Sequence, residues 1–167
     1  MNKQKDSINL PGFRMSRKLD TPIISPIWPE GISLVNFTEN NALQAYQLLQ
    51  LPDQDTADDK TTFIDWWTAL ISDGEYDPSL CFLIYDEIGL VGFAQCWTSA
   101  FIKDLAIHPR RRRQGLGALL LTHVFSVFQK RQANAVDLKV LKSNSGAIQL
   151  YTSSGMQIVE DLHTYRN

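Results

Sequence analysis

Four consecutive arginines, at positions 110–113, stand just before a Gly115-Leu116-Gly117 turn, and this stretch of the chain is suited to binding an anion. Large apolar side chains recur at helical spacing after the turn, which predicts a helix that begins at these glycines. A helix N-terminus carries unpaired backbone N–H groups and the positive end of the helix dipole. Glycine lets phosphate oxygens approach that backbone, where a side chain would hold them away. The stretch therefore predicts a phosphate-binding loop between a strand and a helix.

Spacing distinguishes this loop from two other phosphate-binding motifs. A Walker loop ends in Gly-Lys-Ser or Gly-Lys-Thr, which occurs nowhere in the chain. A dinucleotide-binding fingerprint would require a third glycine at the position of Leu120. What remains is Arg112-x-x-Gly115-x-Gly117, which follows a strand expected to end at Ile107. The arginines could also form a solvated basic patch or a nucleic-acid footprint, but their place before the glycines favours phosphate contact.

A second motif lies near the C-terminal end of the sequence. It reads Asn144-x-x-Ala147-x-x-Leu150-Tyr151, and Gly155 closes the short helix that it predicts. Taken together, the two motifs resemble those of the GNAT superfamily of acetyl-CoA-dependent N-acetyltransferases, in the order in which that superfamily has them. The resemblance covers about residues 31–167. It implies a single α/β domain in which about four helices flank a mixed, centrally splayed sheet.

The resemblance also implies where acetyl-CoA would bind. Backbone N–H groups of the glycine loop would hold its pyrophosphate, and a backbone donor on the preceding strand would polarise the thioester carbonyl. The pantetheine arm would pair with the freed edge of that strand. The residues implied for the cofactor are Leu105, Ala106, Ile107, Arg112, Arg113, Gln114, Gly115, Leu116, Gly117, Ala118 and Asn144.

Two catalytic candidates follow from the same resemblance. Tyr151 would protonate the departing thiolate as a general acid. Many members carry a Glu or Asp on the central strand to deprotonate the acceptor amine, but the matching positions here are Phe101 and Lys103. Simple alternation points the adjacent Asp104 to the opposite face, unless a bulge re-aims it. Asp104 is therefore the candidate base, with a water chain or an acceptor of lower pKa as alternatives.

Simpler structural roles compete with these assignments. Tyr151 could only pack the helix against the sheet, and Asn144 could cap that helix with or without a cofactor contact. The missing carboxylate leaves open a second function, a non-catalytic acyl-CoA-binding module that senses the cofactor or regulates a partner. A nucleic-acid binder is disfavoured by the net charge of −2 and by the lack of a recognition motif.

The elements that must position these residues follow from periodicity and turn signals. The expected order is strand, two helices, three strands, helix, strand, helix and strand. The expected ranges are residues 32–37, 38–49, 63–71, 81–86, 90–98, 101–107, 116–128, 136–140, 144–154 and 156–162.

Residues 1–29 differ from the domain expected at 30–167. They contain four of the seven prolines and show no convincing periodicity, so we expect a proline-rich leader. Residues 1–20 should be loosely packed, whereas the segment 21–29 should pack, because its apolar residues are costly to leave in water. These residues, which would also suit the interface of a homodimer, are Ile23, Ile24, Ile27 and Trp28.

Composition narrows the setting. A chain of 167 residues that is 44% hydrophobic and 20% charged is ordinary for one globular domain. No apolar run reaches the roughly 20 residues of a membrane span, and no signal-peptide pattern opens the sequence. Cys81 and Cys96 are too few for a disulfide framework, and neither they nor the histidines have metal-ligand spacing. We expect a cytoplasmic protein without a metal, with neither nucleic acid nor a membrane as partner.

The acceptor would be an amine of a small molecule or a peptide. Residues 51–78 contain eight acidic residues and one lysine, and this region borders the acceptor side in the resembled fold. The charge predicts a cationic acceptor steered by the acidic residues, although solvated loops and a helix start explain the pattern equally simply. The residues concerned are Asp53, Asp55, Asp58, Asp59, Lys60, Asp65, Asp73, Glu75 and Asp77.

Overall fold

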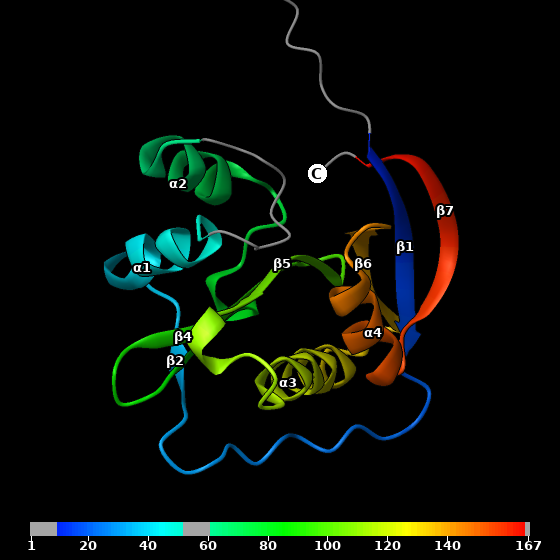
Figure 1. Ribbon diagram of the computed structural model, residues 1–167, viewed down its shortest axis with the longest axis horizontal. Helices are drawn as coiled ribbons and strands as arrows, with labels where there is room; N and C mark the ends of the chain where they lie inside the picture. Colours follow the sequence, from blue (N-terminus) through cyan, green and yellow to red (C-terminus); the bar gives the residue numbers. More distant parts are fainter. Residues whose placement is uncertain (1–9, 52–60, 166–167) are drawn as a thin grey trace, which may run out of the picture.

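The computed structural model describes residues 10–51 and 61–165 and contains a seven-stranded sheet (Figure 1). The strands are β1 (Leu10–Lys18), β2 (Ser33–Asn36), β3 (Cys81–Tyr85), β4 (Leu90–Trp97), β5 (Phe101–Ile107), β6 (Ala135–Leu141) and β7 (Gln157–Tyr165). The helices are α1 (Glu39–Leu49), α2 (Phe63–Ser72), α3 (Leu116–Lys130) and α4 (Ser145–Ser153), with 3-10 turns η1 (Pro78–Leu80) and η2 (Pro109–Arg111). The expected α/β class is confirmed, and no helix in these ranges is long and apolar enough to cross a membrane.

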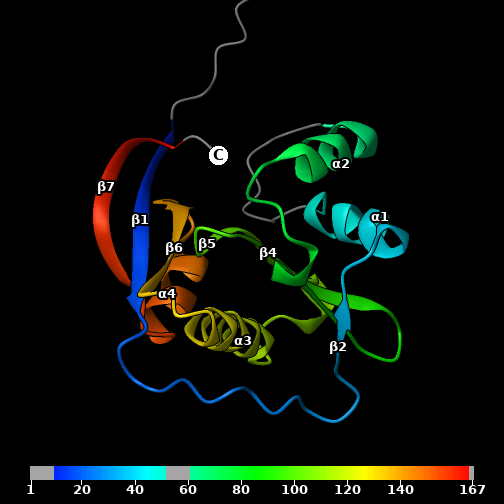
Figure 2. The same ribbon diagram turned by 180° about the vertical axis from the view of Figure 1, so that it is seen from behind.

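Helices cover both faces of the sheet, as the two opposite views show (Figures 1 and 2). α3 and α4 pack on one face, where the core includes Phe125, Leu138 and Tyr151. α1 and α2 pack on the other face, where Ala45 and Leu70 meet residues of the strands. The apolar stripes read from the sequence are thus the buried faces of the helices, and burial of these stripes is what fixes each helix against the sheet.

The sheet is divided near its middle. Its strand order is β2-β3-β4-β5-β6-β1-β7, and β5 and β6 are its parallel neighbours. These two strands pair at Phe101 with Asp137 and at Ile102 with Leu138, although β5 continues to Ile107 and β6 continues to Leu141. The second half of β5 therefore presents a backbone edge toward a gap in the sheet. This is the splayed sheet that the sequence resemblance implies.

The first strand corrects the expectation for the leader. Residues 10–18 form β1, which lies inside the sheet between β6 and β7 and is antiparallel to both. Met15 is fully buried there, so a loosely packed leader is wrong for this segment. The periodicity was hidden because the pairing with β7 shifts register between Arg14 and Met15. As a result the buried residues of β1, Gly12 and Met15, are three apart instead of two.

Residues 19–32 connect β1 to β2 by crossing over α3 (Figure 1). The Gln129 side chain of α3 donates to the carbonyl oxygen of Thr21 at 2.7 Å and accepts from the backbone N–H of Ile23 at 2.8 Å. Ile23 and Trp28 are half-buried against the α3 core, as expected for this segment, whereas Ile24 and Ile27 are exposed. The connection is thus held to α3 by hydrogen bonds and by two of its four large apolar side chains.

Because β1 lies inside the sheet, shortening its buried side chain should destabilise the domain. Met15→Ala should lower the free energy of unfolding by about 2–4 kcal/mol, because it leaves a cavity in a packed core. The matched control is Leu10→Ala on the same strand, where 45% of the side chain is exposed and the cost should be about 1 kcal/mol or less. Urea unfolding followed by circular dichroism measures both, and equally small losses would contradict a structural role for β1.

Candidate active site

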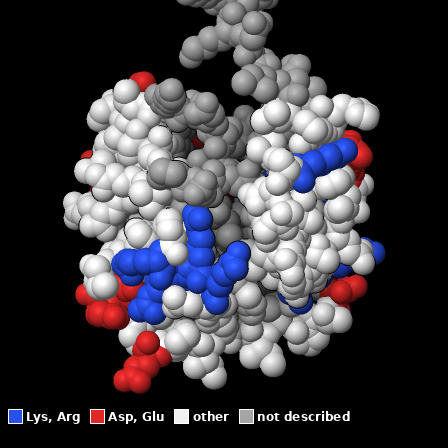
Figure 3. Space-filling model, in the orientation of Figure 1, with Lys and Arg blue, Asp and Glu red and all other residues white. Residues whose placement is uncertain are grey.

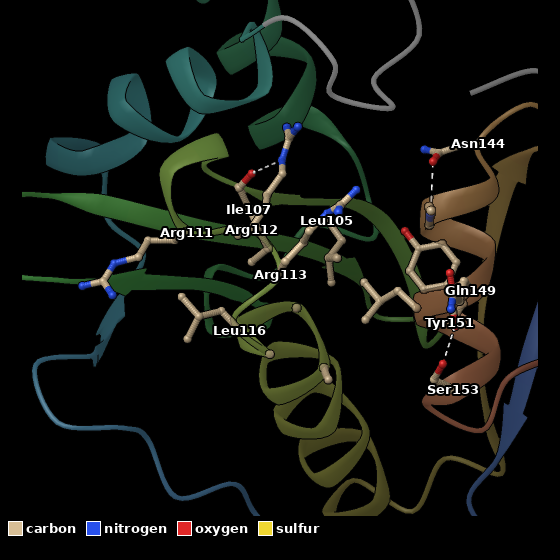
Figure 4. A pocket seen from close by; sticks show the side chains of 16 residues that line it. Leu105, Ile107, Arg111, Arg112, Arg113, Leu116, Asn144, Gln149, Tyr151 and Ser153 are labelled. Atoms are coloured by element: carbon tan, nitrogen blue, oxygen red, sulfur yellow. Dashed lines mark hydrogen bonds between the residues drawn. The ribbon is translucent and has the colours of Figure 1, made fainter.

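A cavity of about 510 Å³ lies beside the part of β5 that continues past its pairing with β6, between the start of α3 and α4 (Figure 4). The structure brings both sequence motifs to its wall. The predicted residues that line it are Leu105, Ile107, Arg112, Arg113, Gly115, Leu116, Gly117, Ala118, Asn144 and Tyr151. Two motifs that are about 30 residues apart in the sequence therefore form one site.

Three predicted residues lie elsewhere. Ala106 is buried on the α1 and α2 face, so only its backbone can serve the cavity. Gln114 is exposed, accepts from Arg111 at 3.1 Å and donates to the carbonyl oxygen of Arg110 at 3.3 Å. Asp104 also stands on the α1 and α2 side of the sheet. The lining residues that the sequence reading missed are Arg111, Gly146, Ala147, Gln149, Leu150 and Ser153, of which Ala147 and Leu150 share the helical face of Tyr151.

The N-terminus of α3 opens onto this cavity. The first helical hydrogen bond runs from the N–H of Leu119 to the carbonyl oxygen of Gly115, so the N–H groups of Leu116, Gly117 and Ala118 precede it. Gly115 caps the helix with a φ of +80°, a left-handed conformation that glycine adopts without strain. A glycine cap has no side-chain oxygen to occupy these donors, so they remain available to an anion.

Gly117 is required for a different reason. A β-carbon at this position would lie 3.0 Å from Cδ2 of Leu150 and 3.7 Å from Cγ1 of Ile107. The bare backbone thus lets α4 approach α3 at the cavity wall. Any larger side chain here must displace Leu150 or enter the cavity itself.

The arginine loop is anchored by Asp86, in the turn between β3 and β4. The Asp86 side chain is buried and accepts hydrogen bonds from both Arg110 and Arg111, the latter at 2.7 Å. Its Oδ1 atom also accepts from the backbone N–H groups of Ile88 and Gly89, each at 3.0 Å. The hydrogen bonds from Arg110, supported by those from Arg111 and the turn, hold the pKa of Asp86 well below its ordinary value despite burial. Two of the four arginines therefore have a structural role.

Arg112 and Arg113 also line the cavity, together with Arg111. Arg112 donates from Nε to the carbonyl oxygen of Ile107 at 3.2 Å, which turns its guanidinium across the end of β5 (Figure 4). Arg113 is exposed and holds a left-handed φ of +59°. Figure 3 shows a compact group of basic side chains beside a hollow in this face of the molecule. The loop thus offers backbone donors and positive charge to the same space.

α4 supplies the opposite wall. Asn144 caps it, because its Oδ1 accepts from the N–H of Ala147 at 3.0 Å, as the sequence predicted. The Tyr151 ring is almost fully buried against the α3 core, and its hydroxyl end points into the cavity (Figure 4). Tyr151 therefore both packs against the core and lines the cavity.

A bulge in β5 places Asp104 on the α1 and α2 side of the sheet. Gln95 of β4 pairs with Asp104, but the next residue, Cys96, pairs with Ile102, so Lys103 is an extra residue. Before the bulge Ile102 packs on the α3 and α4 face, and after it Leu105 does. Asp104 consequently faces the same side as Phe101 and Lys103. Burial raises the pKa of Asp104, and the positive charge of Lys103 opposes that shift.

The structure describes only some of the acidic residues in the segment 51–78. Asp73 and Glu75 line a second cavity on the α1 and α2 face. Asp77 instead accepts from Ser79 at 2.6 Å and from Arg131 at 3.2 Å. The residues that lie outside the described ranges are Asp53, Asp55, Asp58, Asp59 and Lys60.

Comparison with known proteins identifies the family. Residues 40–156 match the profile of the acetyltransferase (GNAT) family, and the chain belongs to that family. It is 41% identical over 56 residues to the [ribosomal protein bS18]-alanine N-acetyltransferase of Escherichia coli, a match that covers 34% of this chain and 38% of that protein. It is 28% identical over 164 residues to the mycothiol acetyltransferase of Thermobispora bispora, covering 86% of this chain and 52% of that protein.

A solved structure agrees with this assignment. The GCN5-related N-acetyltransferase of Sphaerobacter thermophilus superposes with a TM-score of 0.77 at 26% identity. The superposition covers 92% of this chain and 50% of the other. The present chain thus spans about half the length of these relatives, or less.

Loss of the Asp86 carboxylate should destabilise the arginine loop in a pH-dependent way. Asp86→Asn should lower the free energy of unfolding by about 2 kcal/mol at pH 7, a value reduced by solvent screening because the turn lies near the surface. The folded-state pKa is lower than the unfolded one, so this stabilisation is complete above about pH 4 and is lost as the pH falls further.

Urea unfolding at several pH values measures this difference. The control is Glu87→Gln, because Glu87 is exposed and lies 3.7 Å from Arg111, so its charge should contribute almost nothing. A loss at Asp86 that persisted unchanged at pH 2 would contradict the electrostatic explanation.

Proposed function

We propose that this protein is an acetyl-CoA-dependent N-acetyltransferase that acts by direct attack of an amine on the bound thioester. One observation carries the proposal. A cavity with a helix N-terminus, three arginines and a tyrosine lies on one side of β5, and a carboxylate stands on the other side of the same strand. This arrangement suits a transferase, because it allows two substrates to be held close together at the same strand.

The cavity fits acetyl-CoA in three respects. The N–H groups at the start of α3, with Arg112 and Arg113, would hold the pyrophosphate. The backbone edge of β5 from Leu105 to Ile107 would pair with the amide-containing arm, and Asn144 borders the same space. When bound, acetyl-CoA would supply the acetyl group as a thioester, whose C–S bond breaks as the new N–C bond forms.

Two residues of the chain would transfer the two protons of the reaction, one to the departing sulfur and one from the amine. The hydroxyl of Tyr151 points into the cavity and would donate a proton to the departing sulfur. Asp104 would accept the proton that the amine must lose, directly or through one water. A pKa raised by burial brings Asp104 closer to the working pH, which favours a general base.

The bulge at Lys103 also favours catalysis over the acyl-CoA-sensing alternative. That alternative rested on the lack of a carboxylate at Phe101 and Lys103, and Asp104 supplies one on the same face. The acceptor would be an amine of a small molecule or a peptide. The relatives leave this choice open, since one is named for an alanine of a ribosomal protein and another for mycothiol.

Calorimetric titration of acetyl-CoA tests the cofactor site. The wild-type protein should bind it, and Gly117→Glu should weaken binding at least about 100-fold, because it places a carboxylate where the phosphates would lie. Gly74→Glu is the matched control, since a side chain at Gly74 meets nothing within 4 Å and lies outside the cavity wall. If the wild type failed to bind acetyl-CoA, both the transferase and the sensor would be excluded.

Asp104→Asn tests the base once an acceptor amine is in hand. The turnover number should fall about 100-fold, and the fall in wild-type rate at acid pH, through the raised pKa of Asp104, should disappear. Because the folded state disfavours the ionised form, the variant should be as stable as wild type or more stable at neutral pH. Asp20→Asn, at an exposed position, is the control. A variant with full activity would show that Asp104 is not the base.

A further inference from the structure

A second cavity, also of about 510 Å³, lies on the α1 and α2 side of β5. Lys103 of β5 lines this cavity, whereas Leu105, two residues later, lines the cofactor cavity. Asp104 stands between them on the strand, on the side of the second cavity. This space is therefore next to the proposed base and is where an acceptor would enter.

The acidic side chains of this cavity already have partners. Asp137 binds the guanidinium of Arg14 through two hydrogen bonds, at 2.7 and 2.9 Å. Glu75 accepts from the backbone N–H of Ser99 at 3.0 Å, and Asp73 accepts from the backbone N–H of Glu75 at 2.8 Å. These three carboxylates thus already accept hydrogen bonds from groups of the protein itself.

Two lysines that line the cavity have no such ion pair among the described residues. Lys103 and Lys139 come from β5 and β6, on either side of the point where the sheet divides, and both are half-buried in the cavity wall. Within residues 10–51 and 61–165, no carboxylate lies within ion-pair distance of either ammonium group. A carboxylate of a ligand would receive charge-assisted hydrogen bonds from both.

Aromatic side chains complete the cavity. Trp97 and Phe101 line it and are directly opposite each other on the paired strands β4 and β5. Both are half-buried, so they offer apolar surface next to the two lysines. The cavity therefore combines two lysines and an apolar wall, and the candidate base Asp104 directly follows the lining residue Lys103 on β5.

We propose that the acceptor amine also carries a carboxylate, as an amino acid or an amino-acid derivative does, and that Lys103 and Lys139 bind that carboxylate. The proposal rests on the proposed acetyl transfer and names its acceptor class. It differs from the cationic acceptor expected from the acidic segment, and among the described residues this cavity is lined by three basic and three acidic side chains. An acceptor with an amine close to its carboxylate would place that amine near Asp104, the neighbour of Lys103.

Paired acceptors test the proposal by kinetics. L-Leucine and L-phenylalanine are compared with their carboxamides, and release of coenzyme A is measured. The free acids should be preferred even though the amides are less basic and so more readily deprotonated. Lys139→Gln should raise KM for the acids about 10-fold or more, with no change in KM for the amides or for acetyl-CoA. Lys130→Gln, on the exposed end of α3 beside Ser25, is the control for loss of one positive charge.

Binding of the acetylated products separates this proposal from the transferase proposal. N-acetyl-L-phenylalanine and its amide are titrated into the protein in the presence of coenzyme A. Tighter binding of the acid by wild type, lost in Lys139→Gln, supports the carboxylate site even if no amine is acetylated, in which case the transferase proposal alone fails. Equal affinities for acid and amide, no binding of either, or an equal effect of Lys139→Gln on both would overturn the proposal.

Discussion

The loop that lines the cavity beside α3 is anchored by one buried carboxylate. Asp86 fixes the turn after β3 to the 3-10 turn after β5, which directly precedes the loop that leads into α3. Without it, Arg110 and Arg111 would repel each other and the next two arginines. With it, the single negative charge of Asp86 offsets part of the positive charge of Arg110 and Arg111, and Arg112 and Arg113 line the cavity with Arg111. One interaction therefore sets both the shape of the loop and the amount of charge that it offers to a ligand.

A second constraint acts on β5, the strand shared by the two cavities. A regular strand would give Asp104 to the α3 and α4 face, where its charge would oppose cofactor phosphates and disturb an apolar core. The extra residue at Lys103 changes this, so that Lys103 and Asp104 both belong to the opposite face. Ile102, Leu105 and Ile107 still pack on the α3 and α4 side. The strand thus presents its backbone edge and apolar side chains to one cavity and the Lys103 side chain to the other.

The sequence predicted what local patterns encode. The strands and helices from 32 onward matched the structure because their apolar spacing and turn residues are regular, and the two motifs predicted most of the cavity wall. β1 was missed because irregular pairing breaks the alternation of its buried and exposed residues. The sequence did not decide whether β5 contains a bulge, because an apolar-polar pattern does not show an inserted residue. The sequence could not show which arginines bind a carboxylate of the protein itself, because their partner Asp86 lies 24 residues before Arg110. Such pairings depend on tertiary structure and leave no local signal.

β1 explains how a sheet divided in this way stays together. The β6-β1-β7 unit is joined to the rest of the sheet by two residue pairs between β5 and β6, so packing must hold its position. α3 contributes to this because its core includes residues from β4 and from β6, and the connection from β1 to β2 is hydrogen-bonded to α3 through Gln129. The same strand reaches the second cavity, where Arg14 binds Asp137 of β6. The N-terminal segment therefore has two roles, because β1 pairs with both β6 and β7 and its Arg14 also lines the second cavity.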